Sequence, residues 1–406
     1  MALDLIGFGI VVPILGQYAE RYGASGLTVG LLFASYSMAQ LVAAPLLGRL
    51  SDRIGRKPVI VVALIGTALG SFLTGAATVL WLLFAGRIVD GASGGSLAVA
   101  QAAVTDIAPE SERPRLLGLL GAAFGVGFVL GPAIGGLAAL GGPHVPFYVA
   151  GVLATINAVA AMIRLPETNR PGVGHNQPAV EHGIHLVHVP HLPALRHLAV
   201  VGFIAVFAFT SFEATFSLFG SRRFGLTESG TSVVFLLIGL VLVVMQGGLY
   251  GRLTDRAGVG RLYVVALVLI GIGLALTSVS TTWAVLIVAL IALALGQGVA
   301  SPSITTLVTQ HVPPGRRGEA LGFQQSAYAV ARIVGPPAAG ALYDHVGIWS
   351  PYAAGGALCA LGAVLMLGWR LHHSVQSAQE LAVGVSGTVL GDAGRAVAHI
   401  DQGVVE

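Results

Sequence analysis

Apolar segments of about 20 residues recur along the whole chain, and this pattern constrains the fold more than any other feature. A helix needs about 20 consecutive, mostly apolar residues to cross a lipid bilayer. Of the 406 residues, 55% are hydrophobic and 10% are charged, whereas soluble domains carry about 25% charged residues. We therefore predict an all-α membrane protein with twelve transmembrane helices. They are expected at 1–19, 28–48, 58–78, 79–105, 116–140, 146–164, 198–219, 231–250, 262–280, 283–308, 320–343 and 351–371.

The composition also excludes several classes of protein. The 21 Lys and Arg residues against 18 Asp and Glu give a net charge of +3, and they form no basic run that could grip nucleic-acid phosphates. The single cysteine, Cys359, supports neither a disulfide framework nor a cysteine zinc site. We expect no nucleic-acid partner, no cofactor and no resident metal. The lipid bilayer is the environment, and we expect a monomer.

Basic residues indicate how the chain is oriented. Cytoplasmic segments of membrane proteins carry an excess of Lys and Arg. If both termini are cytoplasmic, only Arg21, Arg222 and Arg223 fall outside, whereas sixteen basic residues fall inside. The four tryptophans, Trp81, Trp283, Trp349 and Trp369, all fall at predicted helix ends, where an amphipathic ring prefers the headgroup level. We therefore predict a multi-pass protein of the cytoplasmic (inner) membrane, with both termini in the cytoplasm.

The second half of the chain repeats the first. The segment GRLSDRIGRK at 48–57 returns as GRLTDRAGVGR at 251–261, and Gly131-Pro132 returns as Gly335-Pro336. Parallel repeats of six helices suit a transporter whose site lies at mid-membrane between two rocking bundles. We predict an N-terminal bundle over 1–164, a Pro- and His-rich cytoplasmic linker over 165–197, a C-terminal bundle over 198–371 and a polar tail over 372–406.

The repeated polar segment joins the second and third predicted helices through a short turn. Its glycines permit close approach of two helices, and Pro58 can begin the third helix because its missing N–H costs nothing there. Asp52 could then meet a helix N-terminus or a cation and stabilise one conformation. A basic segment that only fixes the topology is the simpler interpretation, and the two are compatible.

Glycines recur every four residues in the fifth predicted helix. Gly127, Gly131 and Gly135 share one helical face, on which another helix can pack backbone to backbone, and Pro132 adds a bend. The second repeat keeps only Gly335, Pro336 and Gly340, so the pattern is asymmetric. Tight packing alone is the alternative interpretation.

These two motifs resemble those of the major facilitator superfamily, and the second resembles the antiporter signature of its drug:proton exporters. The resemblance covers residues 1 to about 371 and implies the major facilitator fold, two six-helix bundles related by a two-fold axis along the membrane normal. It implies a cytoplasmic latch in which Arg56 contacts an acid at the end of the fourth helix, here Asp106. The implied latch residues are Gly48, Asp52, Arg53, Gly55, Arg56 and Asp106, with Gly251, Asp255 and Arg256 in the second copy. The implied antiporter residues are Gly118, Gly127, Gly131, Pro132, Gly135 and Gly136.

Charged residues inside the predicted helices are few, and each is costly unless it faces a partner or a cavity. Arg87 and Asp90 are three residues apart, which allows them to pair on one helix. Arg87 also resembles the arginine in helix 4 of the superfamily, and this resemblance implies a part in proton transfer. Glu213 and Arg332 lie at similar depths in two other helices and could meet. A carboxylate that exchanges protons near neutral pH needs a raised pKa; burial raises it and a nearby arginine lowers it. We predict proton coupling at Asp4, Asp90, Glu213, Arg87 and Arg332, with structural ion pairs as the alternative.

Aromatic and hydroxyl side chains surround Glu213 in the sequence. An apolar wall with one acid would bind varied lipophilic, often cationic molecules. The predicted cavity residues are Phe209, Phe212, Phe216, Thr210, Tyr36, Gln40, Gln246, Gln297, Gln325 and Tyr328, and we expect Phe203 and Phe219 to face lipid.

Histidines recur every three residues in the linker, at 182, 185, 188 and 191, beside His175 and His197. This spacing fits neither a helix face nor a strand, and prolines interrupt it, so we predict a solvated loop rather than a metal site.

The sequence therefore predicts a secondary transporter that exports small lipophilic compounds in exchange for protons. It lacks the phosphate-binding GxxxxGK[ST] loop, so ATP hydrolysis is not the expected energy source. An exporter of a sugar, siderophore or other metabolite is the first alternative, and a non-transporting sensor is the second. An enzyme is not expected, because no nucleophile, base and orienting group occur together. Tetracycline is a doubtful substrate, because the third and ninth helices lack the acids that tetracycline exporters have there.

Overall fold

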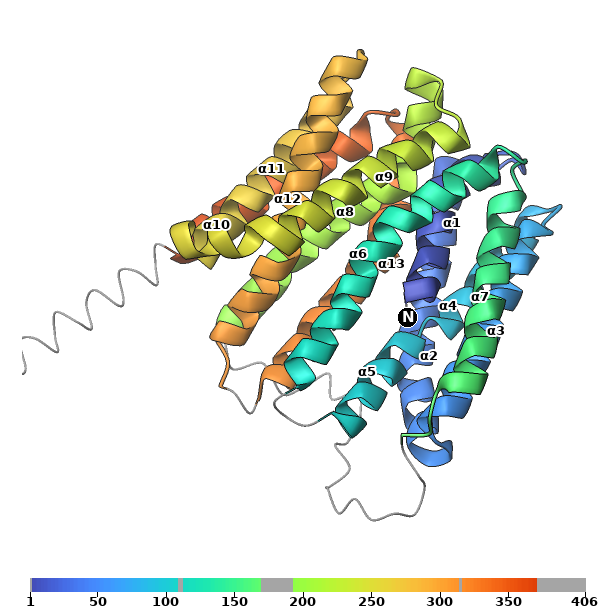
Figure 1. The fold of residues 1–406 in the computed structure, drawn as a ribbon. Helices are drawn as coiled ribbons and strands as arrows, with labels where there is room; N and C mark the ends of the chain where they lie inside the picture. The colour runs from blue at the N-terminus through green and yellow to red at the C-terminus, as the bar shows by residue number, and fades with distance from the viewer. Residues whose placement is uncertain (1, 109–111, 169–192, 314–315, 371–406) are drawn as a thin grey trace, which may run out of the picture.

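The computed structural model describes residues 2–108, 112–168, 193–313 and 316–370, which form helices and their short connections (Figure 1). Within these residues, nine helices are long and apolar enough to span a membrane. Three further segments complete the predicted twelve crossings: α4 with α5, then α6, then α13. The first of these is divided between two helices, and α6 contributes the apolar stretch Gly125–Ala139. The prediction of an all-helical protein with two six-helix halves is confirmed.

The N-terminal half contains seven helices that make six crossings. They are α1 (Ala2–Glu20), α2 (Gly26–Ile54), α3 (Arg56–Gly75), α4 (Leu80–Ser93), α5 (Ser96–Ile107), α6 (Arg113–Ala139) and α7 (Val145–Arg164). The fourth crossing, predicted as one helix over 79–105, is divided between α4 and α5 at Gly94-Gly95. Glycine favours such a break because it loses the most conformational freedom in a helix.

The C-terminal half repeats this order. Its segments are α8 (Pro193–Phe224), α9 (Glu228–Val244), a π-helical segment (Met245–Leu249), α10 (Tyr250–Ala257), α11 (Val259–Val279), α12 (Trp283–Gln310), α13 (Arg317–His345) and a last helix (Ser350–Arg370). The eighth crossing combines α9, the π-helical segment and α10. Helix α8 begins at Pro193, five residues before its predicted start, so it includes the end of the predicted linker.

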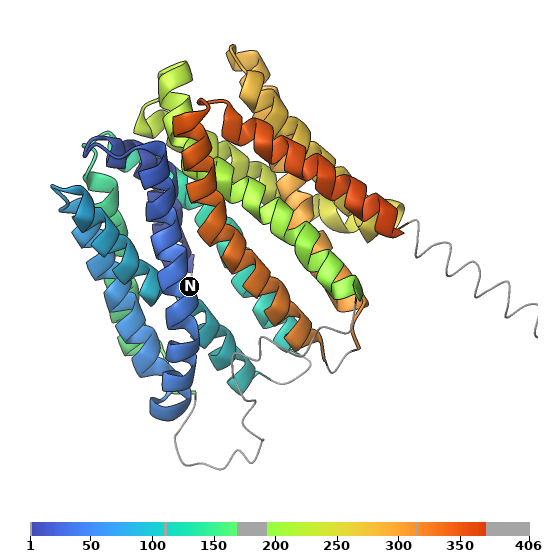
Figure 2. The same ribbon diagram turned by 180° about the vertical axis from the view of Figure 1, so that it is seen from behind.

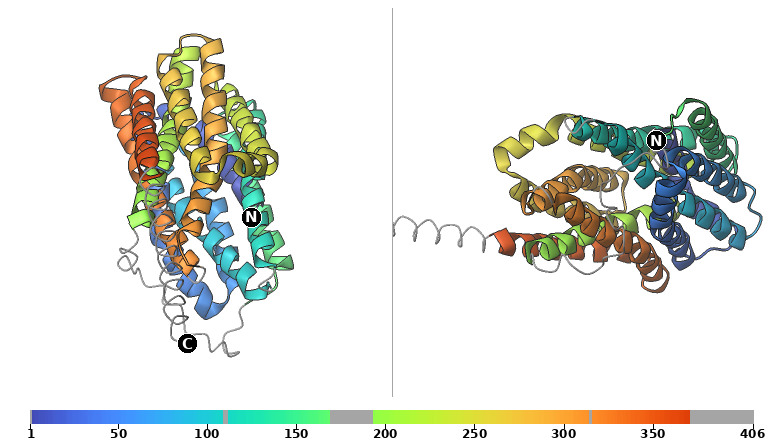
Figure 3. Two further views of the ribbon diagram at one scale, coloured as in Figure 1. Left: turned by 90° about the vertical axis from the view of Figure 1, so that its left-hand side faces the viewer. Right: turned by 90° about the horizontal axis from the view of Figure 1, so that it is seen from below.

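The two halves lie side by side (Figure 3). Helix α2 packs against α13 and α6 packs against α9, and Figure 2 shows α13 (orange) beside α2 (blue). We call the end at which α1 leads into α2, and α8 into α9, the joined end. The opposite end, where α2 leads into α3 and α10 into α11, is the splayed end, because the halves diverge toward it (Figures 1 and 2).

Small residues allow the two halves to approach closely near the joined end. A methyl group added at Gly340 would overlap the backbone of Gly26, and one added at Gly30 would overlap the carbonyl oxygen of Pro336. Between helices in a membrane, packing supplies much of the attraction because burial in lipid already satisfies apolar side chains. The crossing of α2 and α13 therefore depends on these glycines.

Candidate functional site

Arg87 and Asp90 form an ion pair in the interior of the N-terminal half. They lie one turn apart on α4, and their exposed fractions are 2% and 8%. The predicted pairing is therefore present. The Nε atom of Arg87 has no hydrogen-bond partner among the described residues. Because each side chain is buried, each depends on the other for charge compensation.

Tyr36 of α2 covers this ion pair. The Arg87 guanidinium lies 5.2 Å from the centre of the Tyr36 ring, a cation–π contact. The close approach of α2 to α4 requires glycine, since a methyl group at Gly91 would overlap the backbone of Tyr36. One turn further on, Gln40 donates to the carbonyl oxygen of Gly94 at 3.1 Å. The structure thus uses Tyr36 and Gln40, both predicted to line a cavity, to hold α2 against α4 and the start of its break.

Asp4 approaches the same group from α1. Its carboxylate lies within electrostatic range of Asp90 and beside Ser96, the first residue of α5. Tyr36 is within electrostatic range of Asp4, Asp90 and Arg87. The structure therefore brings together two acids, one arginine and one phenol from three helices, although these residues are up to 86 positions apart in the sequence.

Glu213 and Arg332 form the C-terminal counterpart of this group. Glu213 of α8 is partly exposed and Arg332 of α13 is exposed, and they lie within electrostatic range of each other. Arg332 is also within range of Tyr36 across the boundary between the halves. Tyr36 is therefore within electrostatic range of charged residues from both halves.

The phenylalanines around Glu213 lie elsewhere than predicted. Phe212 and Phe216 are 1% and 0% exposed, and their ring centres are 4.8 Å apart. Both pack against Phe235 of α9, each at 6.0 Å, inside the C-terminal bundle. Phe209 is also buried and packs against Phe212. In this conformation the three rings form bundle core.

Phe219 corrects a second expectation about α8. It is 1% exposed and its ring centre lies 4.9 Å from that of Tyr352 in the last helix, so it faces the bundle core and not lipid. Phe203 is half-buried against Phe207 at 5.8 Å. Alternation of apolar and polar residues along α8 could not reveal this, because lipid and protein core select the same side chains.

The remaining predicted cavity residues divide into exposed and buried groups. Gln246, in the π-helical segment, and Gln325, in α13, are exposed. Tyr328 is buried and accepts a hydrogen bond from Gln324 at 2.7 Å. Thr210 is buried and donates to the Val206 carbonyl oxygen of its own helix at 2.9 Å. Gln297 keeps a buried Oε1 atom without a partner among the described residues.

The glycine face of α6 packs against α1, as its spacing predicts. A methyl group on Gly131 would lie 2.6 Å from the backbone of Gly9, and one on Gly127 would lie 2.7 Å from the backbone of Leu5. Gly135 faces Ile10 in the same way, at 3.0 Å from its carbonyl oxygen. The next residue, Gly136, turns toward the other half and accepts a hydrogen bond from Ser229 of α9 at 2.8 Å. Helix α6 therefore connects the helix that carries Asp4 to the C-terminal half.

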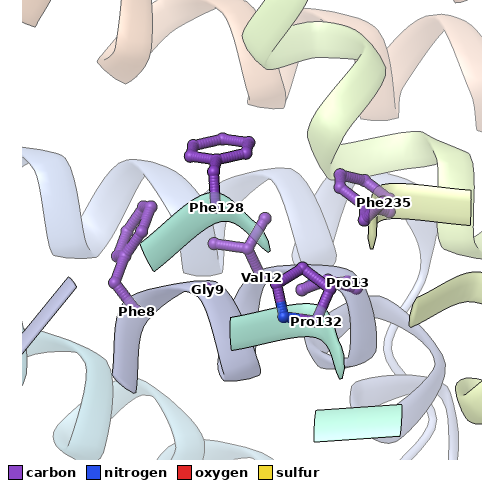
Figure 4. Close-up of a pocket in the computed structure, with 7 residues that line it drawn as sticks. All are labelled: Phe8, Gly9, Val12, Pro13, Phe128, Pro132 and Phe235. Atoms are coloured by element: carbon purple, nitrogen blue, oxygen red, sulfur yellow. The ribbon is translucent and has the colours of Figure 1, made fainter. Parts of the chain in front are cut away.

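A small gap of about 10 Å³ lies where α1, α6 and α9 meet. Figure 4 shows rings of Phe8, Phe128 and Phe235 around it, with Pro13 and Pro132 between them. This volume holds about one water molecule, and its apolar lining offers no hydrogen-bond partner. The gap reflects two proline-containing helices packing together and has no room for a substrate.

Comparisons with known proteins agree with this architecture. The sequence profile of the Major Facilitator Superfamily matches residues 1–250 and 247–395. The chain belongs to this superfamily. It is 29% identical over 370 residues to the class H tetracycline resistance protein of Pasteurella multocida, covering 89% of this chain and 91% of the relative. It is 27% identical to multidrug resistance protein 2 of Bacillus subtilis, covering 90% and 92%. The crystal structure of the human organic anion transporter MFSD10 superimposes with a TM-score of 0.67 at 25% identity, covering 90% of this chain and 96% of that one.

The superfamily loop between α2 and α3 is locked by Arg56. Its guanidinium contacts Asp52 at 2.5 Å and Asp106, at the end of α5, at 2.9 Å, and it donates to the Ser51 hydroxyl at 2.6 Å. The contact with Asp106 is the one that the resemblance implied. In this conformation the three acceptors all belong to the N-terminal half, so the cluster ties α2, α3 and α5 to one another.

Glu167 completes this cluster and was missed in the sequence. It follows α7 directly, and its two carboxylate oxygens accept hydrogen bonds from the backbone N–H groups of Arg56 and Lys57 at 2.8 and 3.2 Å. These N–H groups begin α3, where they have no partner within the helix. The only sequence signal is a single acid after a helix end, and this signal does not indicate which residue the acid contacts.

The predicted histidine-rich loop lies mostly outside the described residues, as does the tail. The histidines at 175, 182, 185, 188 and 191 are not described, whereas His197 stacks on Trp369.

The two copies of the loop predict different tolerance to alanine. Gly55 and Gly258 both have left-handed backbones, with φ of 101° and 75°. A methyl group at Gly55 would also lie 2.5 Å from the Glu167 carboxylate, whereas at Gly258 it would meet open space. We expect Gly258→Ala to cost about 1–2 kcal/mol and Gly55→Ala to cost more and to weaken the Glu167 contacts. Thermal unfolding of both purified variants would check this, and equal losses would contradict the assigned contact.

Proposed function

We propose that this protein exports small lipophilic compounds in exchange for protons by alternating access. The observation that carries the proposal is the group formed by Asp4, Asp90, Arg87 and Tyr36, together with Glu213 and Arg332 on the facing half. Related drug and tetracycline resistance proteins and the glycine face of α6 support export over import. A transporter driven by an ion gradient needs ionisable groups inside the membrane that two conformations present to opposite sides.

The charges in the N-terminal group explain why a proton would bind there. Asp4 and Asp90 have one arginine between them, so with both acids ionised the group carries one excess negative charge in an environment of low dielectric. One bound proton neutralises this charge. Arg87 can pair fully with only one of the two acids, and a cationic substrate competes for the same carboxylates. Proton binding and substrate binding then exclude each other, which is the requirement for exchange.

The orientation follows from the charges at the two ends. Of the basic residues counted in the sequence, three lie at the joined end, Arg21, Arg222 and Arg223, whereas the larger group that includes Arg49, Arg53 and Arg56 lies toward the splayed end. We place the protein in a bacterial inner membrane with both termini on the cytoplasmic side, so the splayed end faces the cytoplasm. The described conformation is then closed toward the outside, and we propose that the protein acts as a monomer.

Amide substitutions test the proton sites. We expect Asp4→Asn, Asp90→Asn and Glu213→Gln, made singly, to abolish proton-coupled export for at least one variant, because an amide cannot exchange a proton near neutral pH. Everted vesicles loaded with a pH-sensitive dye and given a lipophilic cation would report proton movement. Glu319→Gln, at an exposed pair with Arg316 in α13, serves as the control. Wild-type exchange by all three variants would contradict the proposal.

A metabolite exporter of the same fold is the competing proposal. A sugar-like substrate needs converging hydrogen-bonding groups, and the exposed Gln246 and Gln325 could supply two of them. A growth screen over lipophilic cations and antibiotics in a strain without its own pumps separates the two. Protection against several lipophilic compounds favours drug export, whereas an unchanged inhibition profile favours the metabolite exporter.

A further inference from the structure

The joined end carries a group of polar contacts that cross between the two halves. It consists of Gln17, Glu20 and Arg21 from the N-terminal half and Arg222, Glu228 and Asp344 from the C-terminal half. We call these six residues the end clamp. None of them belongs to the charged group at mid-membrane or to the Arg56 cluster at the splayed end.

Asp344 makes the most specific contact of the end clamp. It lies at the end of α13, and its two carboxylate oxygens accept hydrogen bonds from the backbone N–H groups of Gly26 and Leu27, both at 2.8 Å. These residues begin α2, whose first N–H groups have no partner within the helix. The neighbouring Ser25 side chain accepts only from Thr28. A carboxylate at this position also interacts favourably with the helix dipole. The beginning of α2 is therefore capped by the other half of the protein.

Two reciprocal ion pairs flank this cap. Arg21 pairs with Glu228 at 2.6 Å, and Arg222 pairs with Glu20 at 2.9 Å, so each half supplies one arginine and one acid. The Arg222 guanidinium also lies 5.1 Å from the centre of the Tyr343 ring, next to Asp344. Both arginines are about half exposed, at 49% and 51%. Exposed pairs contribute little each and exchange readily with water, which suits contacts that must break repeatedly.

Gln17 adds a buried layer beneath the ion pairs. Its exposed fraction is 7%, and its Nε2 atom lies 3.0 Å from the Ser217 carbonyl oxygen, 3.1 Å from the Leu226 carbonyl oxygen and 3.1 Å from the Thr231 hydroxyl. All three acceptors belong to the C-terminal half. An amide buried with these partners fixes one register of α1 against α8 and α9, because a shift would leave polar groups unpaired.

We propose that the end clamp is the gate of the joined end, and that capping of α2 by Asp344 sets how strongly this end stays shut. The Arg56 cluster joins helices within one half. In the described residues, the end clamp and the Ser229–Gly136 hydrogen bond supply polar contacts that oppose separation of the halves. Opening the joined end would expose the Gly26 and Leu27 N–H groups to water and would break both ion pairs. The inference rests on the proposed alternating access, but not on the identity of the coupled ion or the substrate.

A distance measurement at the joined end tests the gate directly. Thr78, before α4, and Thr281, before α12, are exposed residues of opposite halves that belong to neither the site nor the end clamp. In a Cys359→Ala background, spin labels are attached at Thr78→Cys and Thr281→Cys. Double electron–electron resonance spectroscopy then measures the distance between the labels, which reports the separation of the halves. The full-length protein is measured in lipid without a proton gradient or substrate, so failure of the proposed transport would leave this readout intact.

Asp344→Ala should raise the ratio of open to closed populations at the joined end by about tenfold or more, the scale of one charge-assisted hydrogen bond. Asp344→Asn, which keeps one acceptor oxygen, should give an intermediate ratio and serves if the alanine variant does not fold. Arg21→Glu and Glu228→Arg should each raise the ratio, and their combination should return it toward wild type. Glu319→Ala, at the other end of α13, should leave the ratio unchanged. Distance distributions of the Asp344 variants that match wild type would overturn the proposal.

Discussion

Replacing Arg87 with alanine should abolish proton-coupled export and also destabilise the protein markedly. Arg87 and Asp90 are 2% and 8% exposed, so the variant leaves a carboxylate buried without its counter-charge. Removing one partner of a buried ion pair costs about 3–5 kcal/mol. The cation–π contact with Tyr36 is lost as well. The remaining acids, Asp4 and Asp90, would then hold a proton in both conformations, and a proton that is never released cannot drive exchange.

The double variant Arg87→Ala/Asp90→Asn separates the structural effect from the functional one. It removes both charges, so most of the lost stability should return, while transport should stay absent. Thermal unfolding in detergent and dye-monitored proton exchange in vesicles give the two readouts. Arg164→Ala, an exposed arginine at the end of α7, provides the control and should match wild type in both. Wild-type transport by Arg87→Ala would remove the arginine from the mechanism.

Replacing Gly131 with alanine should separate α1 from α6 and disable the protein. The new methyl group would lie 2.6 Å from the backbone of Gly9 and 2.8 Å from the Ile6 carbonyl oxygen. Neither contact can be relieved by a side-chain rotation, because both partners are backbone atoms. Overpacking a core costs about 1–3 kcal/mol, and we expect at least the upper end of this range. Movement of α1 would also displace Asp4 from Asp90.

Gly125→Ala is the matched control for this prediction. Gly125 lies on the same helix, but its added methyl group would meet only Cγ2 of Val243, at 3.2 Å, and that side chain can yield. We expect Gly125→Ala to keep near wild-type unfolding temperature and export, and Gly131→Ala to lose both. Equal behaviour of the two variants would mean that the glycine face of α6 is not required for packing.

Much of the functional region could be predicted from local spacing. Arg87 and Asp90 are one helical turn apart, so their pairing follows from helix geometry alone. The four-residue spacing of Gly127, Gly131 and Gly135 likewise predicts a face for close packing. Such inferences succeed because they depend only on the period of one helix. The burial of Phe212 and Phe216 depends instead on how α8 is rotated, and an apolar ring suits core, lipid and binding cavity equally.

The resemblance implied the Arg56–Asp106 contact, but the sequence did not indicate other contacts between distant segments. Nothing near Glu167 indicates that it caps the start of α3. Nothing near Asp344 indicates that it caps α2, 317 residues away. An acid can satisfy any helix N-terminus or any arginine that the fold brings near it. The choice among partners is made by the three-dimensional arrangement of helices.

By itself, the sequence determined the membrane environment, the number of crossings, the duplicated halves and the ionisable residues available inside the bilayer. These properties follow from hydrophobic length and local periodicity, which each segment carries on its own. Only the tertiary structure decided which partners each acid contacts and which aromatic rings are buried in the core. It also decided that Gln17, Asp344 and the reciprocal ion pairs join the halves at one end. Those outcomes depend on the rotation and crossing of whole helices, which many weak packing contacts set together.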